Sequence, residues 1–190
     1  MSGRSDPAAV LLVAGGMVTG NIFLVGPMGS GKSAVGRRLA RELGLSFVDS
    51  DEEIERRTGV DIAYIFEKEG EAGFRQREAE IIGELTGRAG LVLATGGGAV
   101  LDAGSRVRLS GRGRVVYLRT TVEQQLARTR HNEDRPLLNN ADPRGTLQRL
   151  MGMRAPYYAE VAAITVDTDG RKVKAVVDQI LRALEALPGA

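Results

Sequence analysis

The sequence contains no cysteine, and this absence excludes a disulfide framework, a thiol nucleophile and a cysteine-ligated zinc site. It also lacks a basic stripe: 22 arginines and four lysines are spread along the chain and the net charge is only +2, so no nucleic-acid partner is expected. The one candidate targeting segment, residues 8–14, is weakly apolar and too short to span a membrane, so no membrane partner is expected. A chain without cysteine is compatible with the cytoplasm, where we expect it.

Length and composition indicate one globular domain. Of the 190 residues, 43% are hydrophobic and 26% are charged, an ordinary balance for a domain with a sizeable core. Met17 stands just before the first predicted strand. We therefore interpret residues 1–16 as a disordered extension and residues 17–190 as the single domain.

Five short apolar runs alternate with segments of helical spacing. The runs, predicted as strands, are residues 21–25, 45–49, 91–95, 115–118 and 163–166. This alternation predicts an α/β fold in which a parallel sheet carries helices on both faces. The clearest helix is the last, where apolar residues from Val173 to Leu184 form one stripe. Asp142 followed by Pro143 marks the start of the preceding helix.

Two regions interrupt this alternation. A helical stretch at about residues 50–85 is much longer than a crossover needs, and Gly59 and Gly70 divide it into three short helices. A polar, turn-rich stretch at about residues 129–141 contains the only histidine, His131, which we interpret as a solvated residue. Insertions of this kind carry binding sites and lids, so we predict an acceptor-binding insertion in the first region and a lid in the second.

Residues 26–33 read G-x-x-x-x-G-K-S, between an apolar run and a helical stretch. The glycines allow backbone N–H groups to turn toward an anion, and the N-terminus of the following helix adds its partial positive charge. Lys32 would reach the outer phosphates, and the Ser33 hydroxyl would hold a magnesium ion. A glycine-rich turn before an ordinary helix is the competing interpretation, but the strand–loop–helix context favours a nucleotide site.

Two carboxylates, Asp49 and Asp51, end the second predicted strand. Ligands bind outside the carboxyl ends of the strands in this class of sheet, and residues two apart in a strand share a direction. One carboxylate would therefore face the magnesium ion and the other a hydroxyl group of the acceptor. Alternatively, Asp51 is only the N-cap of a helix that begins at Glu52.

Three glycines, residues 96–98, follow the third predicted strand, where many P-loop NTPases have an acidic residue that orders magnesium. They indicate either a close approach of the backbone to a ligand or a flexible turn. The missing acidic residue argues against a motor or AAA-type ATPase. No lysine follows an asparagine, so the Asn-Lys-x-Asp guanine motif of Ras-type GTPases is absent as well.

Three of the arginines stand in informative surroundings. Arg75 lies in the inserted helices, suited to pairing with a carboxylate or phosphate, and Arg135 lies in the predicted lid, where it would close on a transferring phosphate. Arg154 precedes Pro156 by two residues, where a helix must end or bend. The following Tyr157-Tyr158 pair is interpreted as packing. Residue type alone does not separate these arginines from solvated ones.

Together these segments resemble the shikimate kinase family, small P-loop kinases of the nucleoside monophosphate kinase type, over about residues 21–185. The glycine loop is generic, but the ordered set of motifs is specific: GPMGSGKS, DSD at 49–51, FR at 74–75, GGG at 96–98, RPLL at 135–138 and RAPYY at 154–158. The resemblance implies a three-layer P-loop kinase fold. Its parallel sheet would have five strands in the order 2-3-1-4-5, with a substrate-binding helical insertion and a lid.

The resemblance also implies a role for each matching residue. The catalytic groups would be Lys32, Asp51 and Arg135. The ATP site would comprise Gly29, Ser30, Gly31, Lys32, Ser33, Ala34, Arg128, Arg135 and Arg171. The shikimate site would comprise Asp51, Arg75, Gly97, Gly98 and Arg154. Magnesium would be held by Ser33 and, through water, by Asp49.

The predicted function is transfer of the γ-phosphoryl group of ATP to the 3-hydroxyl of shikimate, on the pathway to chorismate and aromatic amino acids. The enzyme is expected to be a monomer that binds ATP and shikimate and uses Mg²⁺. Two alternatives stay open from the sequence. One is a P-loop kinase for another small acceptor, such as gluconate or a nucleoside monophosphate, and the other is a nucleotide-binding regulatory protein without a small acceptor.

Overall fold

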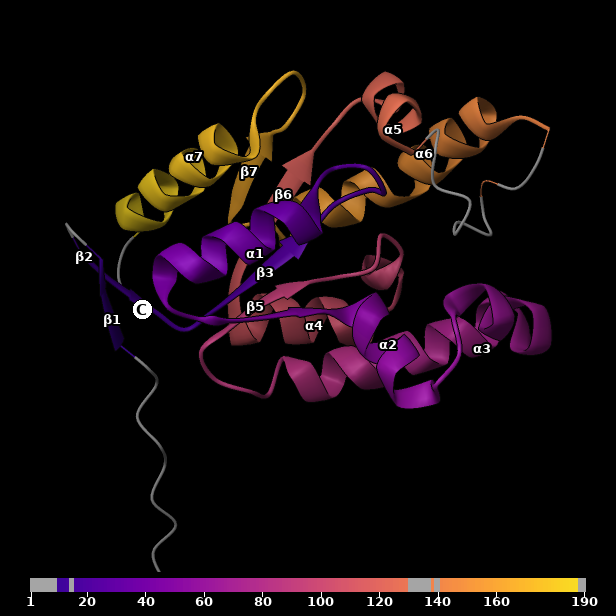
Figure 1. The fold of residues 1–190 in the computed structure, drawn as a ribbon, viewed down its shortest axis with the longest axis horizontal. Helices are drawn as coiled ribbons and strands as arrows, with labels where there is room; N and C mark the ends of the chain where they lie inside the picture. Colours follow the sequence, from indigo (N-terminus) through magenta and orange to yellow (C-terminus); the bar gives the residue numbers. More distant parts are fainter. Residues whose placement is uncertain (1–9, 14–15, 130–137, 139–140, 188–190) are drawn as a thin grey trace, which may run out of the picture.

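The computed structural model describes residues 10–13, 16–129, 138 and 141–187 (Figure 1). At its centre is a parallel sheet of five strands: β3 (Asn21–Val25), β4 (Ser46–Asp49), β5 (Leu91–Ala94), β6 (Gly113–Arg119) and β7 (Ile164–Asp167). They lie in the order β4-β5-β3-β6-β7. Counted along the chain from β3, this is the predicted order 2-3-1-4-5, and the predicted fold class is confirmed.

Side chains of the central strand alternate between the two faces of the sheet. Phe23 and Val25 belong to one hydrophobic cluster, whereas Ile22 and Leu24 belong to the other. All four are fully buried because helices cover both faces. A strand buried on both faces reads as a continuous apolar run, which is why the sequence predicts β3 so clearly.

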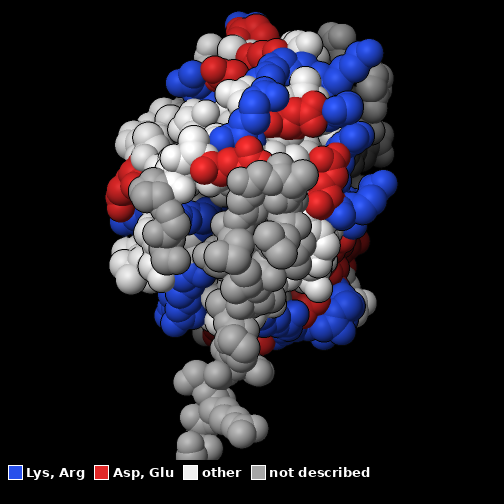
Figure 2. Space-filling model, turned by 90° about the vertical axis from the view of Figure 1, so that its left-hand side faces the viewer, with Lys and Arg blue, Asp and Glu red and all other residues white. Residues whose placement is uncertain are grey.

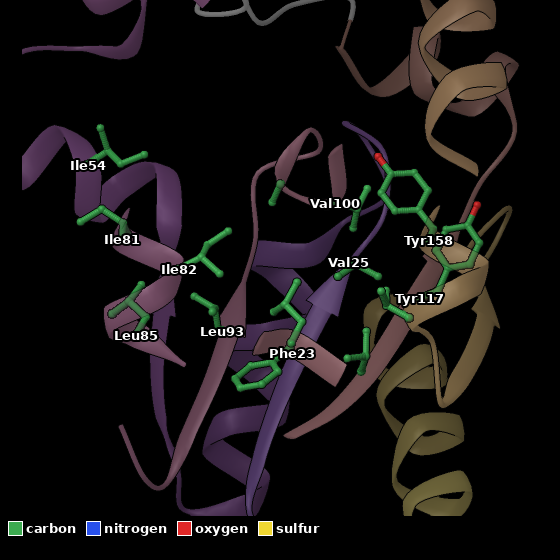
Figure 3. Packing of buried hydrophobic residues seen from close by; sticks show 14 of the residues in the cluster. Phe23, Val25, Ile54, Ile81, Ile82, Leu85, Leu93, Val100, Tyr117 and Tyr158 are labelled. Carbon is green, nitrogen blue, oxygen red and sulfur yellow. The ribbon is translucent and has the colours of Figure 1, made fainter. Parts of the chain in front are cut away.

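Helices cover both faces of the sheet (Figure 1). One face carries α1 (Lys32–Leu43) and α7 (Val173–Ala186), whose apolar stripes pack with Ile22 and Leu24. The opposite face carries α3 (Ile62–Leu85), α4 (Ala103–Arg112) and α6 (Pro143–Val161). Figure 3 shows the cluster on that face, with Phe23 and Val25 beside residues of these helices. The result is the three-layer arrangement that the alternation of strands and helices predicts.

The helical insertion forms α2 (Ser50–Thr58) and α3, with breaks at the two predicted glycines. Gly59 ends α2 with φ 72°, and Gly70 breaks α3 with φ 69° and ψ −178°. Both values lie where only glycine is unstrained. The predicted division into three helical pieces is confirmed.

Shorter elements connect the layers. They are η1 (Ala99–Leu101), a 3₁₀ turn after β5, and α5 (Val122–Thr129), which precedes the predicted lid. Helix α6 begins as predicted, with the Asp142 side chain accepting a hydrogen bond from the Gly145 N–H. It does not end near Pro156, however, but continues to Val161. Buried residues after the proline, such as Tyr158, hold the helix against the sheet and outweigh the single backbone hydrogen bond that proline removes.

Two further strands, β1 (Val10–Val13) and β2 (Gly16–Thr19), form an antiparallel pair that the sequence analysis did not predict. They lie partly within residues 1–16, and β2 contacts α7. The division into an extension and one domain stays a prediction. Among the described residues, no helix is both long enough and apolar enough to cross a membrane.

Candidate active site

The P-loop, residues 26–33, joins the buried end of β3 to the N-terminus of α1. Gly31 is the N-cap of α1 with φ 92°, and Gly26 has φ 143°. A Cβ atom on Gly26 would lie 2.5 Å from the carbonyl oxygen of Leu118, so only glycine fits between β3 and β6. The Nζ atom of Lys32 donates to the carbonyl oxygens of Gly26 and Pro27, both at 2.8 Å. The side chain of Lys32 therefore lies against the P-loop, which the sequence predicts to bind phosphate.

A hydroxyl and a carboxylate meet beside the P-loop. The Ser33 hydroxyl donates to Asp49 Oδ2 at 2.6 Å, and Asp49 Oδ1 accepts from the Asp51 N–H at 3.0 Å. Asp49 is thus the N-cap of α2, and the alternative interpretation of Asp51 as the cap is wrong. The helix starts at Ser50, two residues earlier than the sequence suggested, and this leaves the carboxylate of Asp51 available to a ligand.

The same pair of oxygen atoms fits a magnesium ion. Mg²⁺ prefers hard oxygen ligands and usually keeps several waters beside one or two protein ligands and the phosphates of its nucleotide. Ser33 and Asp49 supply a hydroxyl and a carboxylate at the position where such phosphates would lie. Among the described residues, no group of three or more His, Cys, Asp or Glu side chains could hold a metal ion. The donor set therefore fits magnesium bound together with a nucleotide.

The carboxylate of Asp51 lies in a cleft of about 260 Å³ beside the P-loop. Burial, followed by the negative charges of Glu78 and Asp49, raises the pKa of Asp51 from 3.8 to about 7. The positive charges of Lys32 and Arg75 act in the opposite direction but are outweighed. Asp51 is therefore a carboxyl group that can hold or release a proton near neutral pH.

Glu78, on α3, is a site residue that the sequence analysis missed. Only 2% of its surface is exposed, its Oε2 accepts from Arg75 Nη1 at 2.6 Å, and its Oε1 has no hydrogen-bond partner. Burial raises the pKa of Glu78 against the opposing effect of Arg75. The one available signal was its spacing of three residues after Arg75, which places both side chains on one face of a helix.

Arg75 lies in the helical insertion, where the sequence predicts an acceptor-binding site. Besides Glu78, it contacts Glu71 at 3.1 Å, and its guanidinium lies 5.1 Å from the ring centre of Phe74. A Cβ atom on Gly98 would lie within 2.4 Å of this guanidinium, so the absence of a side chain at Gly98 makes room for it. Arg75 thus reaches the glycine segment, residues 96–98, from the α3 side.

Arg154 reaches the same segment from α6. It is 3% exposed, its Nε and Nη2 atoms have no hydrogen-bond partner, and burial lowers its pKa. Its Nη1 would lie 3.5 Å from a Cβ atom on Gly97. A buried cation with unpaired donors is unfavourable in free energy until an anion pairs with it. The structure therefore brings Arg75, Arg154 and Asp51 together around the glycine segment.

The glycine segment is packed rather than a flexible turn. The Gly96 N–H donates to Ser50 Oγ at 2.9 Å, and the Tyr158 hydroxyl donates to the Gly97 carbonyl oxygen. A Cβ atom on Gly96 would lie 2.1 Å from Glu78 Oε1. Charged side chains therefore occupy the space that the missing Cβ atoms leave, and the close approach of a ligand to this backbone stays a prediction.

The remaining predicted residues have different surroundings. Arg128 lines the cleft, and its guanidinium donates to the carbonyl oxygens of Gly29, at 2.9 Å, and Thr168, at 2.8 Å. It thus ties the P-loop to the segment after β7. Arg171 is not among the residues that line this cleft; it donates to backbone carbonyls near α7, including Ala175 at 3.1 Å. Arg135 and His131 lie outside the described residues, so their roles stay predictions.

Comparison with known proteins gives one consistent family. The family model for shikimate kinase matches residues 28–185. The shikimate kinase of Alteromonas mediterranea is 58% identical over 161 residues, covering 85% of this chain and 94% of that protein. Shikimate kinase 1 of Enterobacter sp. is 54% identical over 167 residues, covering 87% of this chain and 96% of that protein.

Solved structures agree. Shikimate kinase from Acinetobacter baumannii in complex with shikimate has a TM-score of 0.84 and 53% identity, and the match covers 86% of this chain and 91% of that chain. A gluconokinase from Sinorhizobium meliloti, with a TM-score of 0.60 and 22% identity, shares the fold. Because the family model and relatives above 50% identity both cover most of its length, the chain belongs to the shikimate kinase family.

Proposed function

We propose that this chain transfers the γ-phosphoryl group of ATP to the 3-hydroxyl of shikimate, in the cytoplasm and as a monomer. The observation that carries the proposal is the buried guanidinium of Arg154, which has unpaired donors and lines a small pocket together with Pro27 and Met28 of the P-loop. An anionic acceptor satisfies those donors, whereas a nucleotide alone at the P-loop does not. The regulatory alternative, without a small acceptor, leaves this buried cation unexplained.

The donor half of the site follows from the P-loop. Backbone N–H groups of Gly29, Ser30, Gly31 and Ala34 would bind the phosphates, with Arg128 and Arg171 toward the adenine. Lys32 would exchange the carbonyl oxygens of Gly26 and Pro27 for the outer phosphates. Magnesium held by Ser33 and, through water, by Asp49 would neutralise charge on the β- and γ-phosphates.

The acceptor half follows from the glycine segment and its neighbours. Arg75 and Arg154 would pair with the carboxylate of shikimate, beside the backbone of Gly97 and Gly98. Asp51 would accept a hydrogen bond from the 3-hydroxyl. Two carboxylate-binding arginines on one side and a hydroxyl-directed carboxylate on the other suit a small, anionic, polyhydroxylated acceptor.

The reaction then needs positioning and one proton transfer. The 3-oxygen of shikimate forms a bond to the γ-phosphorus, the bond between that phosphorus and the bridging oxygen breaks, and ADP leaves. The hydroxyl proton passes to Asp51, whose pKa of about 7 suits a group that accepts a proton and releases it again. Arg135, in the predicted lid, would stabilise the charge on the transferring group, and closure of the lid would exclude water.

A panel of acceptors tests this proposal. ADP release is measured by a coupled assay with ATP and Mg²⁺, in the presence of shikimate, quinate or gluconate and without any acceptor. We expect turnover that depends on shikimate and exceeds the rates with the other two acids. Turnover with gluconate alone would favour a kinase for another acceptor, and acceptor-independent hydrolysis alone would favour the regulatory alternative.

A further inference from the structure

Tyr158 does more than fill the core. It is fully buried in α6, and its ring stacks on Tyr117 with the centroids 5.1 Å apart (Figure 3). Its hydroxyl group donates a hydrogen bond to the carbonyl oxygen of Gly97. Tyr158 also follows Arg154 by four residues, so one face of α6 presents both side chains to the glycine segment.

Ser50 holds the same segment from the other side. Its side chain is fully buried, and its Oγ atom accepts a hydrogen bond from the Gly96 N–H at 2.9 Å. Ser50 is the middle residue of the DSD motif and immediately precedes Asp51. The hydrogen bond therefore ties the end of β5 to the beginning of α2, where the hydroxyl-directed carboxylate lies.

The two hydrogen bonds, with Ser50 and Tyr158, hold the backbone of two consecutive glycines, which have more backbone freedom than any other residue. The amide of Gly96 and the carbonyl of Gly97 are each bound by a hydroxyl group, one next to Asp51 and the other one helical turn from Arg154. Within the described residues, no oxygen accepts a hydrogen bond from the Gly97 N–H. This N–H group is therefore available to a ligand. The hydroxyl groups thus connect both halves of the acceptor site through the glycine backbone.

We propose that Ser50 and Tyr158 form a hydroxyl clamp on the Gly96–Gly97 backbone that sets the separation of Asp51 and Arg154. Both are positioning residues: they touch the backbone, not the acceptor. The clamp fixes the distance between the group that receives the acceptor's carboxylate and the group that receives its hydroxyl. This inference rests on the proposed function, because it assumes that one acceptor bridges Asp51 and Arg154.

The main test compares two adjacent tyrosines. Tyr158→Phe removes the clamp hydroxyl and keeps the ring that stacks on Tyr117. Tyr157→Phe is the matched control, because the ring of Tyr157 packs at the edge of the same cluster and faces Arg106. We expect Tyr158→Phe to raise the KM for shikimate about tenfold, the effect of one lost buried hydrogen bond. The KM for ATP should stay within about twofold, as should both KM values of Tyr157→Phe.

Ser50 provides an independent arm that leaves the aromatic core untouched. Ser50→Ala should give the same selective rise in the KM for shikimate, and Ser50→Thr, which keeps a hydroxyl group, should restore most of it. Thermal unfolding of each variant, with and without shikimate, shows whether it is folded. A role in stability alone would lower the Tm without changing the ratio of the two KM values.

Two results would overturn the clamp. One is a wild-type KM for shikimate in both the Tyr158→Phe and the Ser50→Ala variant. The other is an equal rise in the KM values for ATP and shikimate in these variants. Should Tyr158→Phe fail to fold, Ser50→Ala and Ser50→Thr decide the matter in the same way. Absence of shikimate-dependent turnover in the wild-type protein would instead contradict the proposed function, so the two failures are distinguishable.

Discussion

At the scale of single residues, the acceptor side of the cleft is built from charges that oppose the stability of the free protein. Arg154 is buried with unpaired donors, Glu78 is buried with one unpaired oxygen, and Asp51 lies close to two other carboxylates. Each arrangement is unfavourable until a ligand supplies the missing partner. Such strain is common at functional sites, where activity and stability make opposite demands.

The variant Asp51→Asn tests, through the pH dependence of the Tm, whether the ionised Asp51 carboxylate destabilises the folded protein. The pKa of Asp51 is about 7 in the folded protein against 3.8 as a model value, so the folded state favours the protonated form. The stability from this protonated group is present below pH 3.8 and is lost as the pH rises through about 7. Asparagine never ionises, so Asp51→Asn should raise the Tm by about 4 °C at pH 8 and clearly less at pH 5.

The measurement is thermal unfolding of both proteins without nucleotide or magnesium, paired with the turnover assay. We expect the more stable variant to be at least about 100-fold less active, because it lacks the proton acceptor. A Tm below that of the wild type at pH 8, or a difference that does not change with pH, would contradict the raised pKa.

Arg75→Ala tests the pairing of this arginine with the acceptor carboxylate. The substitution removes a charge from the acceptor half only, so the KM for shikimate should rise by at least about tenfold more than the KM for ATP. Arg77→Ala is the matched control: Arg77 lies two residues along the same helix and pairs with Glu69 on the surface, so both KM values should be unchanged. Equal rises in both KM values for Arg75→Ala would count against a carboxylate role.

At the scale of elements, the site depends on where helices and strands begin and end. The P-loop lies where β3 ends and α1 begins, and Asp49 serves both as the N-cap of α2 and as the partner of Ser33. Gly70 redirects α3 so that its second part carries Arg75 and Glu78 toward the sheet. Helices and the loops at their ends, more than the strands, therefore carry the predicted site residues.

A pair of glycine substitutions tests the break in α3. Gly70 has φ 69°, where an L-residue is strained although a Cβ atom there would meet nothing within 4 Å, so Gly70→Ala should destabilise by about 1 kcal/mol. Gly152 lies in α6 with equally open surroundings and without a positive φ, so Gly152→Ala should stabilise by up to about 1 kcal/mol. Denaturant unfolding measures both, and the same sign for the two variants would contradict this account of the break.

The five strands of the sheet and the three-piece insertion could be predicted because their signals are local. An apolar run such as that of β3, or a glycine with positive φ such as Gly59, is visible in a short window of sequence. The strand order was predicted from the resemblance to a family, since apolar runs do not indicate which strands are neighbours in the sheet. The pair β1 and β2 was missed because the apolar run of β1 lies within residues 1–16, which were interpreted as an extension outside the domain.

The site was predicted in part, and the missing residues share a physical reason. Glu78, Ser50 and Tyr158 act through contacts between elements, and the partners Ser50 and Gly96 are 46 residues apart in the chain. Nothing in the residue type distinguishes such a group from an ordinary core or surface residue. The capping role of Asp49 was missed because a start of α2 at Ser50 or at Glu52 fits the sequence equally well.

At the scale of the whole molecule, the two hydrophobic clusters meet through the shared central strand. Because Phe23 and Ile22 serve opposite clusters, neither layer of helices can pack without β3. Figure 2 shows, on the described part of one face, Lys and Arg interspersed with Asp and Glu rather than gathered by sign. The described surface also carries ion pairs such as Arg119–Asp167.

The shared strand predicts a single cooperative unfolding transition for residues 17–190. Scanning calorimetry should show one transition whose calorimetric and van't Hoff enthalpies agree, shifted upward together when ATP and shikimate are added. Two separable transitions, with only one shifted by shikimate, would show that the helical insertion unfolds on its own.

We propose that the P-loop and the arginines around the glycine segment form one site for two substrates. The most direct test of this proposal is the structure of the product, determined by phosphorus–proton correlation NMR after incubation of the protein with ATP, Mg²⁺ and shikimate. We expect one phosphorylated product for each ADP, with the phosphate on the 3-oxygen of shikimate. ADP released without phosphorylated shikimate, or phosphate on another hydroxyl group, would contradict it.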